Sequence, residues 1–116
     1  MNVDPARMQV SAQEASRLLK ALANEQRLMI LCQLTEGERS VSELGSRVTL
    51  SQSALSQHLA RLREDGLVAT RRESQTIYYR LASKAAEAVI QTLYRTFCRP
   101  ASGRGGTTRS DRANRD

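Results

Sequence analysis

Hydrophobic residues recur at the spacing of an α-helix along much of the chain. In the first such segment, Leu18, Leu19 and Leu22 fall on one stripe. The later segments are preceded by asparagine or serine, which are typical helix N-caps, and Ser40 with Glu43 forms the pattern of a capping box. The pattern predicts five helices, over residues 11–22, 25–35, 40–48, 51–66 and 83–98.

The hydrophobic period shortens to two residues between the fourth and fifth predicted helices. Ile77, Tyr79 and Leu81 alternate with Tyr78 and Arg80, which is typical of a half-buried β-strand. The sequence therefore predicts a hairpin with strands over residues 67–72 and 76–81. The expected fold class is mainly α-helical with a small β-hairpin, in the order four helices, two strands and one helix.

Composition divides the 116-residue chain into one domain and two flanking segments. Residues 1–10 carry no helical stripe and are expected to be a flexible N-terminus. Residues 99–116 hold five arginines and two aspartates but few apolar residues, so we expect a disordered Arg/Gly-rich tail. Residues 11–98 then form a single domain of ordinary size.

The net charge of +6 permits a nucleic acid as partner, although half of that charge lies in the predicted tail. No apolar run is long enough for a signal peptide or a membrane span, so we expect a cytoplasmic protein with reduced thiols and no membrane association. The sequence contains no phosphate-binding loop and no Ser/His/Asp arrangement on suitable elements. We therefore expect neither an enzyme nor a bound cofactor.

The fourth predicted helix has one leucine face and one polar face. Leu55, Leu59 and Leu62 fall within a narrow arc of a helical wheel. Glutamine and arginine can pair with base edges, and small residues allow close approach to DNA, although a polar face is also typical of a helix that is merely solvated. The side chains expected to meet DNA from this helix are Gln52, Ser53, Ser56, Gln57, His58 and Arg61.

The neighbouring segments favour the DNA-binding interpretation. The capped helix over residues 40–48 precedes the polar helix at the spacing of a helix-turn-helix, whose second helix enters the major groove. The hairpin follows as a wing, with Arg71, Arg72 and Gln75 near its tip, where they can reach phosphates or the minor groove. The sequence therefore predicts a winged helix-turn-helix that binds double-stranded DNA.

These residues resemble the ArsR/SmtB family of bacterial winged-helix repressors. The resemblance rests on residues 50–68, on Arg71-Arg72 followed by residues 77–81, and on residues 20–28, which match the entry into that family's second helix. It covers about residues 11–98. It implies a homodimer that binds an imperfect palindrome in an operator and dissociates from that DNA in response to a signal.

The fifth predicted helix carries an apolar stripe, including Ala86 and Tyr94, that is wider than one small domain needs for its core. The resemblance assigns part of this stripe, together with leucines of the first helix, to the subunit interface. The expected interface residues are Leu18, Leu19, Leu22, Val89, Ile90, Leu93 and Phe97.

Two cysteines lie on different predicted helices. Cys32 falls on the apolar face of the second helix, where a small buried residue is common, whereas Cys98 ends the fifth helix beside two arginines, where exposure is expected. Residues 31–34 and the Phe97-Cys98 pair resemble the thiol-sensing branch of the same family. That resemblance implies a redox-sensing pair, in which a reactive sulfur species or another oxidant links the two cysteines and lowers DNA affinity.

The sequence gives little support for a metal site. In metal-sensing members of the family the ligands are cysteines on the third helix or Asp and His on the fifth, whereas here residues 40–44 carry serines and residues 83–98 contain no His or Asp. Two alternatives stay open. One is a metal-released or constitutive regulator of the same family, and the other is a dimeric interaction module or anti-repressor that acts on another regulator.

Overall fold

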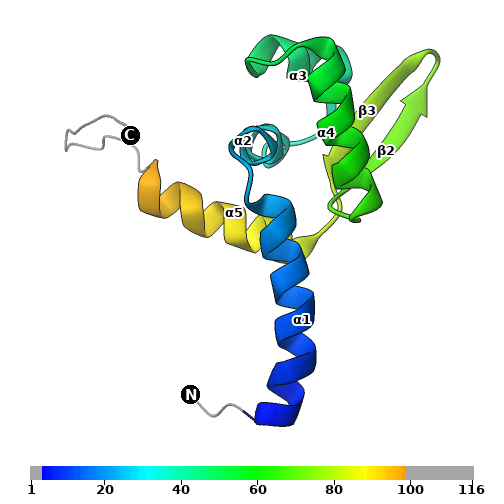
Figure 1. Cartoon of the computed structure of the whole chain (residues 1–116). Helices are drawn as coiled ribbons and strands as arrows, with labels where there is room; N and C mark the ends of the chain where they lie inside the picture. Colours follow the sequence, from blue (N-terminus) through cyan, green and yellow to red (C-terminus); the bar gives the residue numbers. More distant parts are fainter. Residues whose placement is uncertain (1–3, 99–116) are drawn as a thin grey trace.

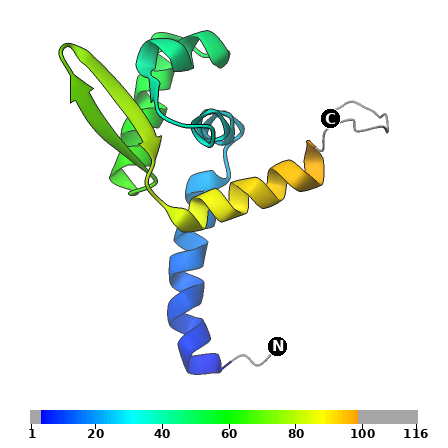
Figure 2. The same cartoon turned by 180° about the vertical axis from the view of Figure 1, so that it is seen from behind.

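The computed structural model describes residues 4–98, which form helices around a small antiparallel sheet. Figures 1 and 2 show two long helices, α1 and α5, extending away from a more compact part built from the other elements. The mainly helical fold class with a small β-structure is confirmed. The elements are α1 (Pro5–Leu22), α2 (Glu25–Leu34), β1 (Arg39–Ser40), α3 (Val41–Arg47), α4 (Gln52–Glu64), β2 (Val68–Glu73), β3 (Thr76–Leu81) and α5 (Lys84–Phe97).

The helix N-caps lie where the polar pattern predicts them. Asn24 accepts a hydrogen bond of 3.0 Å from the backbone N–H of Arg27, and thereby satisfies one of the free donors at the start of α2. Ser40 and Glu43 form a complete capping box at the start of α3, with hydrogen bonds of 2.8 and 3.1 Å. Ser51 and Ser83 cap α4 and α5 in the same way. These caps fix the order and the ends of the helices.

The first helix begins at Pro5 rather than near residue 11, so residues 5–10, which the sequence assigned to a flexible N-terminus, are helical. Residues 1–3 lie outside the described residues. The Asp4 side chain accepts a hydrogen bond from the backbone N–H of Ala6, and proline is favoured in the first turn of a helix because its fixed φ suits that position. The hydrophobic pattern misses this start because the added turns are exposed and carry no buried stripe. The predicted tail over residues 99–116 lies outside the described residues.

The sheet has three strands rather than the predicted two, in the order β1-β3-β2, and both pairings are antiparallel. In the hairpin, Val68 lies opposite Leu81 and Glu73 lies opposite Thr76, so the turn contains only two residues. The first of them, Ser74, has a positive φ of 56°, as tight hairpin turns require. The two-residue strand β1 pairs with Tyr78 and Tyr79, and α3 begins immediately after it.

The hydrophobic core lies between α2, α3, α4 and the start of α5. Leu31, Leu44 and Leu62 have no exposed surface, and other buried leucines of these helices surround them. The long helix α1 contributes the buried Ala21 and Leu22 of its last turn, and the half-buried Leu18 packs against the same core. Within residues 4–98, no helix is both long enough and apolar enough to cross a membrane.

Candidate DNA-binding face and thiol pair

Helix α4 presents its polar side to solvent. Leu55, Leu59 and Leu62 are at most 2% exposed and hold the helix against the core. Most of the predicted DNA-contacting side chains of this helix are exposed, and His58 is half-buried. The exposed ones are Gln52, Ser53, Ser56, Gln57 and Arg61. The structure therefore brings the hydrogen-bonding groups of α4 onto one accessible face.

Helix α3 packs closely against α4, as the first helix of a helix-turn-helix must. A Cβ atom added at Gly45 would lie 3.8 Å from Leu55 Cδ2, so the two helices approach to ordinary van der Waals contact there. Leu44 of α3 and Val48, which caps the end of α3, are buried. Figure 1 shows the hairpin extending beside α4, at the position of a wing.

The three predicted wing residues are all exposed, but their surroundings differ. Arg71 donates to both carboxylate oxygens of Glu38, at 2.8 and 2.9 Å, and to Glu73 at 2.9 Å. Arg72 donates a longer bond of 3.2 Å to the backbone carbonyl of Ser74. Arg71 is therefore held by two carboxylates, whereas Arg72 lies next to the turn.

Electrostatics reinforce the position of Arg71. The hydrogen bonds to Glu38 and Glu73 raise the pKa of its guanidinium, and the same bond from Arg71 lowers the pKa of the Glu38 carboxyl. The guanidinium also lies 4.7 Å from the centre of the Tyr78 ring, within cation–π range. No sequence pattern points to Glu38, because it lies 33 positions from Arg71 and belongs to no motif.

The two cysteines have unequal environments. Cys32 is half-buried on α2, whereas Cys98 is exposed at the end of α5. Burial raises the pKa of the Cys32 thiol, and the charge of the Cys98 thiolate raises it further. Cys32 also lines a hollow of about 370 Å³ between α2 and α5, together with Tyr94, which lies one turn before Cys98.

The predicted interface residues separate into two groups. Leu22 and Ile90 are only 4% and 2% exposed, so within a single chain they belong to the core and offer little surface to a partner. Leu19 and Phe97 are 55% and 76% exposed, on α1 and α5 respectively. The remaining three are half-buried, namely Leu18, Val89 and Leu93.

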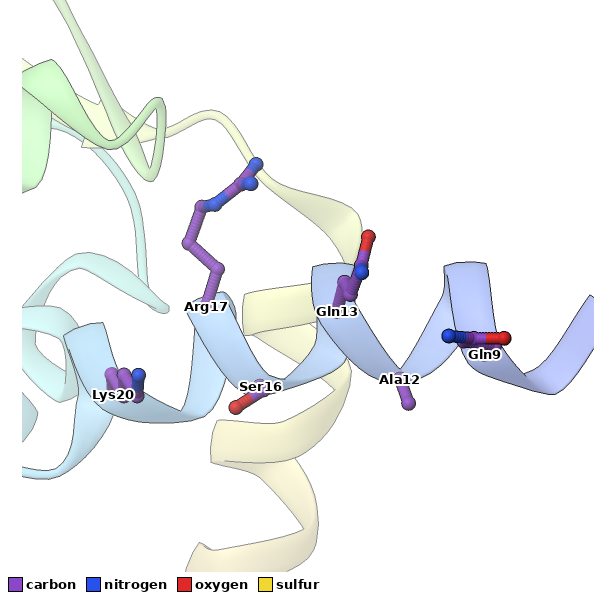
Figure 3. A pocket seen from close by; sticks show the side chains of 6 residues that line it. All are labelled: Gln9, Ala12, Gln13, Ser16, Arg17 and Lys20. Carbon is purple, nitrogen blue, oxygen red and sulfur yellow. The ribbon is translucent and has the colours of Figure 1, made fainter.

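A second hollow, of about 580 Å³, lies along the outer side of α1. Figure 3 shows that all its labelled side chains come from this one helix, among them Gln13, Arg17 and Lys20. A surface formed by one exposed helix does not enclose a small ligand as a typical binding pocket does. Among the residues that the structure describes, no group of three or more His, Cys, Asp or Glu side chains is placed to hold a metal ion.

Bacterial regulators are among the known proteins that resemble this chain. The model of the arsR family of bacterial regulatory proteins matches residues 24–70. The transcriptional activator HlyU of Vibrio cholerae is 57% identical over 91 residues, which cover 78% of this chain and 84% of HlyU. The biofilm growth-associated repressor of Agrobacterium fabrum is 48% identical over 93 residues, which cover 80% of each chain.

Solved structures agree with the fold. The structure of reduced HlyU from Vibrio cholerae superposes with a TM-score of 0.76 at 56% identity, covering 79% of this chain and 97% of that chain. A homodimeric winged helix-turn-helix DNA-binding domain from Mycobacterium bovis gives a TM-score of 0.67 at 31% identity, covering 83% of this chain and 89% of that one. The arrangement of α3, α4 and the hairpin is thus a winged helix-turn-helix.

Proposed function

The chain belongs to the ArsR family of bacterial DNA-binding transcriptional regulators, and from this premise we propose that it is a cytoplasmic repressor controlled by the thiols of Cys32 and Cys98. In this proposal a homodimer binds a palindromic operator, and a reactive sulfur species or another oxidant lowers its affinity by linking the two cysteines. The observation that carries the proposal is the exposed polar face of α4 beside a hairpin wing.

The proposed DNA contacts come from two elements. The polar side chains of α4 are the right types to read base edges in the major groove, with Gln pairing to adenine and Arg to guanine or phosphate. Ser51 caps α4, so its first turn, with exposed Gln52 and Ser53, has a fixed geometry toward the groove. The wing adds Arg72 and Gln75, which are exposed at the turn between β2 and β3.

The exposed apolar residues of α1 and α5 support a homodimer. Large hydrophobic side chains on a lone chain favour a partner that covers them, and Leu19 and Phe97 lie on the two helices that extend away from the core. A two-fold dimer would place two α4 helices about one turn of DNA apart, roughly 34 Å. This spacing requires an operator with two related half-sites.

The thiol pair supports a redox switch that operates in two exchange steps. The exposed Cys98 thiolate attacks the outer sulfur of a persulfide R–S–SH, which gives Cys98–S–SH and the released thiolate R–S⁻. The Cys32 thiol then displaces the terminal sulfur as H₂S and forms a Cys32–Cys98 disulfide. A bond between α2 and α5 would favour one arrangement of the reading helices over another, and a few kcal/mol of such bias changes affinity by tens to hundreds of fold.

The test is a DNA-binding titration on the promoter of its own gene, before and after treatment with a persulfide donor. We expect tight, salt-dependent binding of the reduced protein and at least tenfold weaker binding after treatment, reversed by a reductant. Intact mass measurement identifies the product, as a loss of two hydrogen atoms for a disulfide or a gain of whole sulfur atoms for a polysulfide.

Two single variants complete this test. Cys32→Ser and Cys98→Ser each retain DNA binding but no longer respond to the donor, because one thiol cannot form the bridge. If the wild-type protein keeps its affinity while mass measurement shows that both thiols are modified, the switch is refuted and the DNA-binding role stands. If the reduced protein shows no salt-dependent affinity for duplex DNA, the DNA-binding role itself fails.

A further inference from the structure

We propose that the ion pair between Glu38 and Arg71 is a strap that fixes the wing to the helix-turn-helix, and that Arg71 is a positioning residue rather than a DNA contact. The inference deepens the proposed function, because it rests on the wing meeting DNA. It assigns the direct wing contact to Arg72 and the turn, and it gives a role to an acidic residue on a DNA-binding domain.

The pair crosses the sheet. Glu38 immediately precedes β1 and Arg71 lies in the middle of β2, while β3 runs between these two strands. In the register of the sheet, Tyr78 lies opposite both Ser40 and Arg71, so the three residues form one row across it. The Arg71 guanidinium passes over the Tyr78 ring at 4.7 Å and reaches both oxygens of Glu38. The Arg71 side chain thus joins β2 to the residue that immediately precedes β1, across the central strand β3.

The end of the strap at Glu38 is firmly held. The next residue, Arg39, donates from Nε to the backbone carbonyl of Gln33 in α2, at 2.9 Å, and pairs in the sheet with Tyr79. Ser40 then caps α3. Glu38 therefore belongs to the segment that sets the position of the helix-turn-helix, whereas Arg71 belongs to the wing.

The geometry of Arg71 does not suit a phosphate contact. Arg71 uses three of the five N–H donors of its guanidinium on Glu38 and Glu73. Turning these donors to a phosphate would leave both acids unpaired beside a polyanion. Within residues 4–98 no carboxylate pairs with Arg72, whose side chain donates to the backbone carbonyl of Ser74 at the turn. The two neighbouring arginines consequently have different roles.

Whether one substitution strengthens or weakens DNA binding separates the two possible roles of Arg71. Glu38→Gln removes a negative charge near DNA and releases Arg71. If Arg71 contacts phosphate, this variant binds DNA as tightly as wild type or more tightly. If the pair is a strap, the variant binds roughly three- to tenfold more weakly, because the wing loses its fixed position. We expect the weaker binding, measured by fluorescence anisotropy on one operator duplex.

A double-mutant cycle and a salt titration complete the experiment. Arg71→Gln and the double variant Glu38→Gln/Arg71→Gln should bind about as weakly as Glu38→Gln alone, because each breaks the same strap. Arg72→Ala should reduce the slope of log affinity against log salt by about 0.9 for each phosphate that Arg72 neutralises, whereas Arg71→Gln leaves the slope unchanged.

Glu36→Gln is the matched control. It makes the same change of charge in the same loop, but its partner is Arg39 rather than the wing, and its side chain is 73% exposed. We expect it to bind DNA like wild type, and thermal unfolding checks that every variant is folded. Unchanged or tighter binding of Glu38→Gln overturns the strap, and so does a reduced salt slope in Arg71→Gln. A wild-type salt slope in Arg72→Ala instead contradicts the proposed contact of Arg72 with DNA. The strap is then judged separately, by whether Glu38→Gln weakens DNA binding.

Discussion

At the scale of single residues, burial distinguishes the two cysteines. Burial, and to a lesser extent the proximity of Cys98, raises the pKa of the Cys32 thiol, so at a given pH less of Cys32 is the reactive thiolate. We therefore expect an alkylating reagent to modify the exposed Cys98 faster than Cys32 near neutral pH. The rate at Cys32 should keep rising to a higher pH than that of an ordinary thiol before it levels off, because its pKa is raised. Peptide mass spectrometry after timed labelling measures both rates.

A cysteine variant tests which cause dominates the raised pKa of Cys32. Cys98→Ser removes the charge of the Cys98 thiolate but leaves the burial of Cys32 unchanged. The pKa of Cys32 should therefore fall only part of the way toward the ordinary value of a thiol. A complete return would show that Cys98, rather than burial, dominates. Equal labelling rates of the two thiols in the native protein would contradict the expected order of reaction.

At the scale of elements, the N-cap of α4, the helix proposed to enter the major groove, leads to a direct prediction. Ser51 accepts a hydrogen bond of 3.1 Å from the backbone N–H of Ala54 and so begins α4. Ser51→Ala should lower the free energy of unfolding by about 1 kcal/mol, as loss of an N-cap typically does, and it should weaken DNA binding because the first turn frays. Urea denaturation and an operator titration measure the two effects.

A serine inside a helix provides the comparison. Ser46 is exposed within α3 and donates to the backbone carbonyl of Glu43, so it caps nothing. Ser46→Ala should leave stability unchanged or raise it by a few tenths of a kcal/mol, since alanine has the better helix propensity. If Ser51→Ala behaves like Ser46→Ala, the cap does not define the start of α4.

The elements that follow local rules could be predicted from the sequence, and those that depend on distant partners could not. Caps such as Asn24 and Ser51 lie within a few residues of the groups they satisfy, and they placed the starts of four helices correctly. Strand β1 has only two residues and exists because β3 pairs with it, so no periodicity reveals it. Glu38 meets Arg71 only after the sheet has formed, so sequence spacing could not identify the pair.

At the scale of the whole molecule, the shape of the single chain predicts association. Helices α1 and α5 extend from the compact part, and they carry large apolar side chains that the chain itself does not cover, such as Leu19 and Phe97. Helices in proteins gain most of their stability from tertiary packing, yet α1 packs on its own chain mainly near its C-terminal end. Most of α1 therefore lacks a packing partner within the single chain. A second copy that packs on α1 and α5 would supply it.

Leu19→Asp tests this arrangement. The substitution places a charge on an exposed residue of α1, so we expect the dimer to dissociate at micromolar concentration and operator affinity to fall by at least tenfold, since one reading helix binds alone. Met29→Asp is the control, because Met29 is a 44% exposed apolar residue on α2, outside the two projecting helices. Sedimentation equilibrium should find Met29→Asp dimeric and Leu19→Asp monomeric. A Leu19→Asp variant that remains dimeric would place the interface elsewhere, and the two α4 helices would then need a different geometry to read a palindrome.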